Sequence, residues 1–337
     1  MFVVFLSPKK KYAFLLVIIL IAGALFFRNS YWGYFKKQAY GVKPGVVIGE
    51  EGLEGLTQEE VEAAVTAVFG GWHVEPVDAQ FDPQFDIIIP ELWGYEVDIP
   101  ATVAKIMSAA KNEEVEPVLK PLRPEITMQD YPGAFIEKGN PQKKKVALMV
   151  NVAWGTEHIL PMLEIFDAGD AQATFFVVGK WAQKNEDLLQ EISRRGHLLA
   201  NHGFSDAVVF TEISVAEMEH SLREVNEIVQ AATGQVPCYF TPHKGAYNEL
   251  VLETVARQEM RMLMWSIDTV DWMKPGVQKM KERVLGNLHP GAIILAHPTA
   301  DTVDLFAEIV PIINDKGFKL VTMAELLNPD EPPAVLK

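Results

Sequence analysis

Between residues 146 and 328, short apolar segments alternate with amphipathic helical patterns, and this alternation limits the possible folds more than any other feature of the chain. Helices are predicted at Glu186–Arg195, which ends before Gly196, and at Ser214–Ala232, before Gly234. The predicted strands are Val146–Asn151, Ala173–Gly179, Leu198–His202, Tyr239–Thr241, Met262–Ser266, Ala292–His297 and Lys319–Thr322. Strands that alternate with helices form a parallel sheet covered by helices, so we expect an α/β domain whose sheet is open or closed into a barrel.

Polar side chains fall near the carboxyl ends of several predicted strands, where the active sites of parallel sheets collect. These residues are Asn151, His202, Thr241, Asp268 and His297, and Asp206, His243 and Asp271 lie close to them in the sequence. His202 and Asp206, four residues apart just after a strand, carry ligand types that suit zinc and similar divalent ions. That pair alone leaves two interpretations open, a metal site and a hydrogen-bonded loop histidine.

Length and composition indicate more than one domain and exclude some partners. At 337 residues the chain is longer than an average domain, and a hydrophobic content of 49% suffices for substantial cores. The formal net charge of −15 opposes binding to nucleic acid or to an anionic membrane surface, because both are negatively charged. Cys238 is the single cysteine, so an intrachain disulfide is excluded.

The N-terminal segment predicts export. Lys9–Lys11 precede the uncharged segment Tyr12–Phe27, which as a helix spans about 24 Å against the ~30 Å hydrocarbon core of a bilayer, while the flanking lysines and Trp32 could reach the interfaces. A cleaved signal peptide is the alternative, because Ala22–Ala24 offers the small residues of a cleavage site. We favour residues 1–28 as a cytoplasmic tip and single-pass anchor in the cell membrane, with the remaining domains outside the cytoplasm. Cleavage would instead secrete the protein.

A small α+β module is predicted over residues 44–126. Its predicted elements are a helix after the capping box Thr57–Glu60, a second helix over Pro100–Lys111, and extended segments over Asp78–Ile89 and Val115–Leu122. Residues 127–145, which include Pro132 and Gly133, are interpreted as a linker to the main domain at 146–328.

Two stretches of the small module, Asp78–Asp82 and Gly94–Asp98, resemble the peptidoglycan-binding module of the vancomycin-resistance W-type proteins. The resemblance implies contact with the cell wall. A spacer that holds the main domain away from the membrane is the alternative.

Five sequence motifs occur in order along the main domain. They are Ala173–Gly179, Gly196-His197 leading to Asn201-His202, Gly245–Asn248, Trp265–Trp272 and Ile293–His297. With these motifs the chain resembles the polysaccharide deacetylase (NodB homology) family. The resemblance implies a distorted (β/α) barrel, and a hydrolase that removes N-acetyl or O-acetyl groups from chitin-like sugars or peptidoglycan with a metal-bound water. The first motif, Asn151–Gly155, looks like that of a degenerate, sporulation-type subgroup.

The chain departs from the family pattern at the residues that activate water. Asn151 and Val152 stand where the family has its general base and a metal-ligating aspartate, and Thr241 replaces the arginine that orients the base. An asparagine cannot accept a proton near pH 7, and loss of a general base typically slows a reaction by about 10²–10⁴. By the same resemblance, His297 matches the general acid, and Asp268 matches the fourth motif. We expect Asp268 to orient His297, with a solvated loop aspartate as the alternative.

The resemblance also bears on the metal. His202 matches a metal-ligating histidine, Asp206 stands where the family has a second one, and His243 replaces a proline on a loop beside the same pocket. His202, Asp206 and His243 would together restore a set of two histidines and one carboxylate for a divalent metal such as zinc.

Aromatic residues could hold a sugar at this site. Trp154, Tyr247 and Trp272 are expected to line the groove and to pack on sugar rings, although packing in the core is the alternative for the tryptophans. Two functions remain open: a membrane-anchored deacetylase of N-acetylated cell-wall glycan, and a deacetylase fold that binds the glycan without catalysis. Both imply the glycan and, through the anchor, the membrane as partners, and no nucleic acid.

Overall fold

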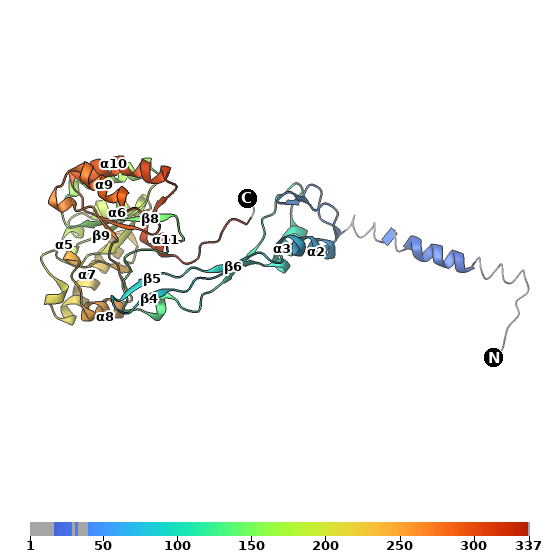
Figure 1. Ribbon diagram of the computed structural model, residues 1–337, viewed down its shortest axis with the longest axis horizontal. Helices are drawn as coiled ribbons and strands as arrows, with labels where there is room; N and C mark the ends of the chain where they lie inside the picture. Colours follow the sequence, from blue (N-terminus) through green and yellow to red (C-terminus); the bar gives the residue numbers. More distant parts are fainter. Residues whose placement is uncertain (1–16, 29–30, 33–39, 336–337) are drawn as a thin grey trace, which may run out of the picture. The chain divides into compact units, whose positions relative to one another are not determined.

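The computed structural model describes residues 17–28, 31–32 and 40–335, which form two compact units (Figure 1). One unit comprises the described residues up to Glu75 together with Gly94–Leu122 and 332–335. The other comprises Pro76–Trp93 and Arg123–Glu331.

Part of the predicted membrane anchor lies outside the described residues, namely residues 1–16. Residues 17–28 are helical. Across the portion of the chain that the structure describes, no helix combines the length and the apolar character needed to cross a membrane.

The first unit packs two helices with short antiparallel strands. Helix α2 (Gln58–Phe69) begins at Thr57, whose side chain and that of Glu60 form the predicted capping box. Helix α3 (Ile99–Ser108) begins at Asp98, whose carboxylate accepts a hydrogen bond from the Ala101 backbone. The strands are β1 (Val47–Ile48) with β2 (Glu51–Gly52), and β3 (His73–Val74), β6 (Gly94–Val97) and β7 (Leu119–Leu122).

The two units divide the chain differently from the expected boundaries at 44–126 and 127–145. Strands β4 (Gln80–Asp82) and β5 (Ile87–Ile89) form a hairpin that belongs to the second unit, where Ile87 pairs with Phe135. The expected linker also belongs to this unit, because its backbone hydrogen-bonds to the main sheet. These pairings join residues far apart in the sequence, so the local pattern of prolines, glycine and lysines gives no sign of them.

The second unit is built on a parallel sheet, which within the described residues has eight strands. They are β8 (Lys145–Val152), β9 (Ala173–Val177), β10 (Leu198–Asn201), β11 (Tyr239–Phe240), β12 (Arg261–Met262), β13 (Ile267–Asp268), β14 (Ile293–Ala296) and β15 (Lys319–Val321). Their order is β12-β11-β10-β9-β8-β14-β13, and β15 pairs with the first residues of β8. The α/β class predicted from the sequence is therefore confirmed.

The sheet curls into an incomplete barrel. Strands β12 and β13 stand at opposite ends of the strand order, yet only Leu263–Ser266 separate them in the sequence. Five Cα steps reach at most about 18 Å, whereas a flat sheet of seven strands would place these strands about 29 Å apart. Two residues of the expected linker pair with the sheet: Ile136 with Leu263, which follows β12, and Lys138 with Ala292, which precedes β14.

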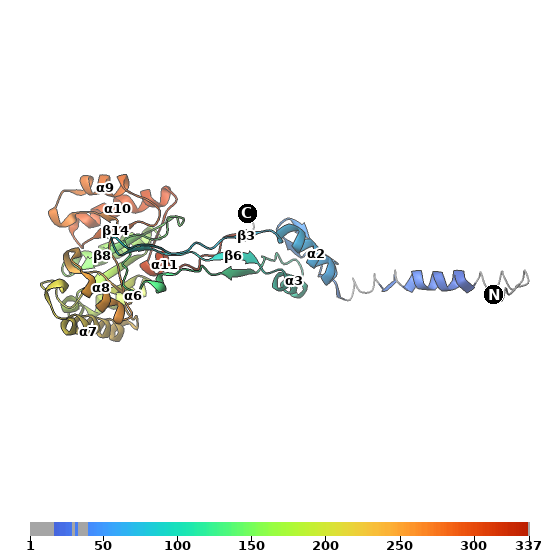
Figure 2. The ribbon, with the colours of Figure 1, turned by 60° about the horizontal axis from the view of Figure 1, so that its bottom comes forward.

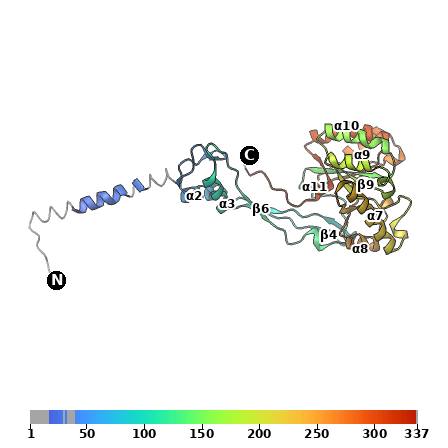
Figure 3. The same cartoon turned by 180° about the vertical axis from the view of Figure 1, so that it is seen from behind.

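Helices cover the outside of the curled sheet (Figures 2 and 3). The longer ones are α4 (Ile159–Ala168), α6 (Glu186–Arg194), α7 (Val215–Thr233), α8 (Glu249–Arg257), α9 (Val277–Gly286) and α10 (Ala300–Asp315), and α5 (Gly179–Ala182) and α11 (Met323–Leu327) are short. Helices α9 and α10 lie side by side, joined by an ion pair of 2.8 Å between Lys281 and Glu308.

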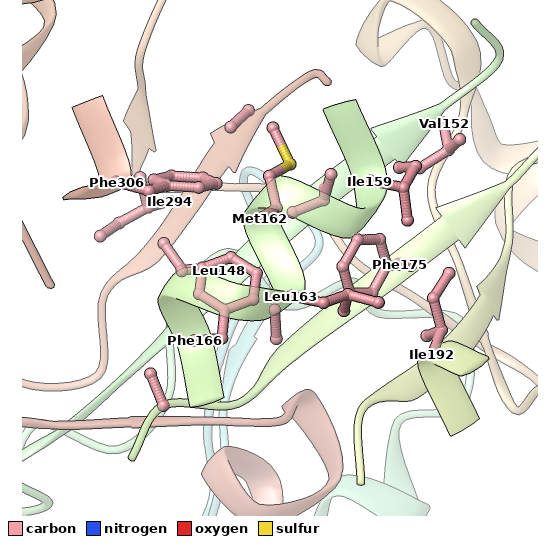
Figure 4. Packing of buried hydrophobic residues seen from close by; sticks show 14 of the residues in the cluster. Leu148, Val152, Ile159, Met162, Leu163, Phe166, Phe175, Ile192, Ile294 and Phe306 are labelled. Atoms are coloured by element: carbon pink, nitrogen blue, oxygen red, sulfur yellow. The ribbon is translucent and has the colours of Figure 1, made fainter. Parts of the chain in front are cut away.

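Alternation along β8 decides which of its side chains can reach a site. Leu148, Val150 and Val152 pack outward against the helices, in a core that includes Phe166 and Phe306 (Figure 4). Ala147 and Met149 pack on the opposite, inner face of the curled sheet. Asn151 follows in this alternation, so its side chain belongs to the inner face.

Candidate functional site

A pocket of about 610 Å³ lies at the carboxyl ends of the strands. Its lining residues come from the ends of β8, β10, β11, β13 and β14: Asn151, Ala153, Trp154, His202, Asp206, Pro242, His243, Lys244, Trp265, Asp268, Trp272, Leu295 and His297. The structure thus brings together all the predicted site residues except Tyr247, Thr241 and Asp271. Five lining residues were not predicted, and of these Ala153, Trp265 and Leu295 lie inside the quoted motifs, whereas Pro242 and Lys244 do not.

Asn151 supplies a neutral amide to the floor of the pocket. Its side chain is 4% exposed, and its Oδ1 atom is buried without a hydrogen-bond partner in the protein. Val152, the next residue, is fully buried in the outer core against the helices. The first motif therefore provides no carboxylate, either as a base or as a metal ligand.

His202 and His243 form a pair of buried imidazoles. Their ring centroids are 4.0 Å apart. The Nδ1 atom of His202 donates to the Thr241 carbonyl oxygen at 2.7 Å, so its Nε2 atom keeps a free lone pair. Burial lowers the pKa of His202 well below its usual value, and burial lowers the pKa of His243 to about 4. Both rings are therefore neutral near pH 7.

These residues do not complete a metal site of the family type. Among the described residues, no group of three histidine, cysteine, aspartate or glutamate side chains is close enough to hold a metal ion. Asp206 is exposed on the pocket rim and does not form a three-ligand group with His202 and His243. Tight zinc sites use three or four protein ligands. In this structure His202 and His243 are adjacent, and Asp206 does not join them in a three-ligand group.

His297 is held by Asp271 rather than by the predicted Asp268. The Nδ1 atom of His297 lies 2.8 Å from Oδ1 of Asp271, whose other oxygen accepts from the Thr302 hydroxyl at 2.9 Å. Asp268 instead accepts a hydrogen bond from the Val270 backbone at 2.7 Å. The turn after β13 brings the Asp271 carboxylate into contact with His297. The Asp268 carboxylate instead accepts a hydrogen bond within this turn.

The pocket has two exposed tryptophans, and one of them stands beside His297. Trp154 is 46% exposed, and its ring lies nearly parallel to that of His297, at 6.0 Å between centroids. Gly155 makes this possible, because a Cβ atom there would lie 2.0 Å from the Pro298 carbonyl oxygen. Trp272 is 60% exposed.

Unlike the two tryptophans, Tyr247 does not line the pocket. Its ring packs edge-on against Phe135 at 4.9 Å, and it contributes to a side cluster instead of lining the pocket. The predicted sugar contact at Tyr247 is therefore not present in this structure. Its motif was recognisable, but the sequence did not reveal that Phe135, from the expected linker, covers the ring.

Comparisons with known proteins agree with this fold and site. The sequence profile of the polysaccharide deacetylase family matches residues 138–263. The protein YlxY of Bacillus subtilis (strain 168) is 32% identical over 257 residues, which cover 76% of this chain and 80% of that protein. A peptidoglycan-N-acetylglucosamine deacetylase of Bacillus cereus is 28% identical over 198 residues, covering 57% of this chain and 72% of the relative.

Solved structures give the same result. A carbohydrate esterase family 4 pseudoenzyme from Bacillus anthracis superimposes with a TM-score of 0.68 at 29% identity, covering 80% of this chain and 96% of that one. A mutant of that pseudoenzyme with restored enzymatic activity gives the same TM-score at 27% identity, covering 80% and 99%. By its motifs, its curled parallel sheet and these relatives, the chain belongs to the polysaccharide deacetylase family.

Proposed function

We propose that this protein binds an N-acetylated cell-wall glycan in the pocket at the strand ends and does not hydrolyse it. One observation carries the proposal: the residue at the position of the family's general base is Asn151, a buried amide with an unpartnered oxygen. The fold and the pocket remain, while the group that would activate water is absent.

The other carboxylates that line the pocket, Asp206 and Asp268, do not stand at the position of that group. Hydrolysis of an acetamide requires a base within hydrogen-bond reach of the attacking water. The Asp268 carboxylate already accepts a backbone hydrogen bond, and His297 is tied to Asp271 in the arrangement expected for a proton donor. A bound metal would supply Lewis-acid activation in this family, but the ligand set described above does not fit one.

The pocket keeps features suited to a sugar. Trp154, Trp265 and Trp272 offer aromatic rings on which the C–H faces of a pyranose can pack, and Leu295 adds an apolar surface for an acetyl methyl group. Asn151 and Asp206 offer polar atoms for hydroxyl or amide groups. The names of the relatives, which include peptidoglycan and chitooligosaccharide deacetylases, support a glycan of this class.

Location outside the cytoplasm is part of the same proposal. A cell-wall ligand requires export, and Lys9–Lys11 followed by the apolar segment Tyr12–Phe27 is the sequence feature that supports it. We propose a single-pass anchor, with secretion after cleavage as the alternative outcome. Fractionation of cells that express the full chain, followed by N-terminal sequencing, separates the two.

The binding proposal is tested by titrating the full chain with the tetrasaccharide of N-acetylglucosamine in a calorimeter and then recovering the sugar for mass spectrometry. We expect saturable binding and a recovered tetrasaccharide that retains every acetyl group. Loss of acetyl groups during the incubation would contradict the proposal and favour the hydrolase. Failure to bind this sugar or peptidoglycan fragments would exclude both functions.

A further inference from the structure

A second hollow of about 540 Å³ lies against the same two tryptophans as the first pocket. Its lining residues are Trp154, Gly155, Glu157, His158, Asp271, Trp272, Lys274, Pro298, Thr299, Ala300 and Asp301. Trp154 and Trp272 line both hollows. The indole pair is therefore shared by two neighbouring spaces, each large enough for a sugar ring.

The turn that carries Trp272 is held in an unusual conformation. Val270 and Lys274, on either side of the short helix η5 (Asp271–Met273), have φ angles of 59° and 52°, in the left-handed region that a β-branched residue such as valine rarely adopts. Asp268 accepts a hydrogen bond from the Val270 backbone and Asp271 accepts one from the His297 backbone, and these bonds fix the turn. Strained turns that persist in this way cluster at binding sites.

This strained turn exposes apolar side chains to solvent. Trp272 is 60% and Met273 63% exposed, so neither contributes much to the core. Trp154, which lines the same two hollows, is also exposed. A rigid pair of exposed indoles between two hollows is suited to the apolar face of a ligand rather than to folding.

The second hollow also presents free hydrogen-bonding groups. Within the described residues, the Asp301 carboxylate, in the first turn of α10, has no hydrogen-bond or ion-pair partner. Glu157 contacts only His158, at 3.6 Å, and Lys274 adds an ammonium group to the same lining. Carboxylates accept hydrogen bonds from hydroxyl groups, so the hollow matches a ring that carries several of them.

We propose that the second hollow is a second saccharide subsite, and that a glycan crosses the tryptophan pair with one sugar in each hollow. This inference rests on the proposed binding of glycan in the first pocket. The ligand class is a hydroxyl-rich oligosaccharide of at least two rings, whose C–H faces pack on Trp154 and Trp272. Hydroxyl groups of the second ring bind Asp301 and Glu157.

The test compares the full chain's affinity for N-acetylglucosamine with its affinity for the disaccharide and the tetrasaccharide. We expect the longer sugars to bind at least about tenfold more tightly, since each charge-assisted hydrogen bond and ring contact adds to the affinity. Asp301→Ala should weaken binding of the tetrasaccharide about tenfold and leave the monosaccharide unchanged. Asp304→Ala is the matched control, because Asp304 is an exposed aspartate on the same helix and lines neither hollow.

Equal affinities for the three sugars would overturn the second subsite and leave the proposed function intact. An Asp301→Ala protein that binds the tetrasaccharide as tightly as Asp304→Ala would also overturn it. Absence of binding at every length would reject the proposed function itself. Unchanged binding of the monosaccharide by Asp301→Ala shows that this variant is folded.

Discussion

The Nδ1 atom of His297 lies 2.8 Å from the carboxylate of Asp271, which is 1% exposed. The same carboxylate accepts hydrogen bonds from the His297 backbone and from Thr302, so it joins the end of β14 to the start of α10 and to the turn after β13. The pairing of His297 with a buried carboxylate, expected for the proton donor of this family, is thus present in a chain with Asn151 at the position where the resemblance places the base. Under the proposed function, the chain differs from a hydrolase at the residues that would activate water.

Replacing Asp271 should be costly for folding. In Asp271→Ala, three donors lose their acceptor in a buried setting, and we expect the free energy of unfolding to fall by about 3 kcal/mol or more. Asp268→Ala, which removes one backbone hydrogen bond from a half-buried carboxylate, should cost about 1 kcal/mol. Urea denaturation of the two variants measures both values, and equal losses would contradict the assignment of Asp271 as the partner of His297.

Trp154 should act in binding more than in folding. Because its side chain is 46% exposed, Trp154→Ala should change the free energy of unfolding by less than about 1 kcal/mol, while glycan affinity falls by about 1–2 kcal/mol. Phe85→Ala is the control, since Phe85 is an exposed aromatic residue of the same unit that lines neither hollow. A loss of stability of about 3 kcal/mol with unchanged affinity would show that Trp154 is a core residue.

Lys143 should behave as a structural residue although it lies in the expected linker. Its buried ammonium group pairs with Glu331 at 3.1 Å and donates to the backbone carbonyl oxygens of Leu326 and Asn328. Glu331 is 39% exposed and also pairs with Lys145, so the loss in Lys143→Ala comes mainly from the backbone carbonyl oxygens left without a donor, and we expect it to be about 1–3 kcal/mol. The exposed neighbour Lys144 provides the control, and thermal melts of Lys143→Ala and Lys144→Ala that coincide would refute this role.

His197 should make stability depend on pH. Its Nδ1 atom accepts a hydrogen bond from the Ala173 backbone, and burial lowers its pKa to about 4. The unfolded chain, with a histidine pKa near 6.5, binds more protons between these values, so stability is full above pH 6.5 and falls as the pH drops toward 4. The shift corresponds to about 3 kcal/mol.

The measurement for His197 is the difference in unfolding free energy between the native chain and His197→Gln. We expect this difference to shrink by about 2–3 kcal/mol between pH 7 and pH 4.5. Other buried histidines affect both proteins alike. A difference that stays constant over this range would show that His197 titrates normally in the folded state.

The strand positions of the main domain could be predicted because they depend on local patterns. β8, β9, β10, β14 and β15 lie within a few residues of the expected segments. β13 was missed, since Ile267–Asp268 is a two-residue strand inside an aromatic-rich motif and its pairing with β14 leaves no periodic signal. The backbone contacts of residues 127–145 could not be predicted either, because Ile136 and Gly139 hydrogen-bond to Met262 and Gly291, which are far away in the sequence.

The candidate site could also be predicted only in part from local sequence patterns. Because Asn151, His202 and His297 each follow a predicted strand, the sequence predicted that they share one site, and all three line the pocket. Spacing after the strands could not decide between Asp268 and Asp271 as the partner of His297, because both lie in one short motif and the choice depends on how the turn at Val270 is folded. Nor could spacing show that Asp206 stays at the exposed rim while His243 packs against His202.

We propose that the pocket binds an N-acetylated glycan without removing the acetyl group. Acetate release from the tetrasaccharide of N-acetylglucosamine tests this proposal, with the full chain in excess over the sugar, with zinc added, and followed over many hours. We expect the sugar to be bound and acetate to stay at the level of a protein-free blank. Acetate release that increases with protein concentration and stops when zinc is chelated would contradict it.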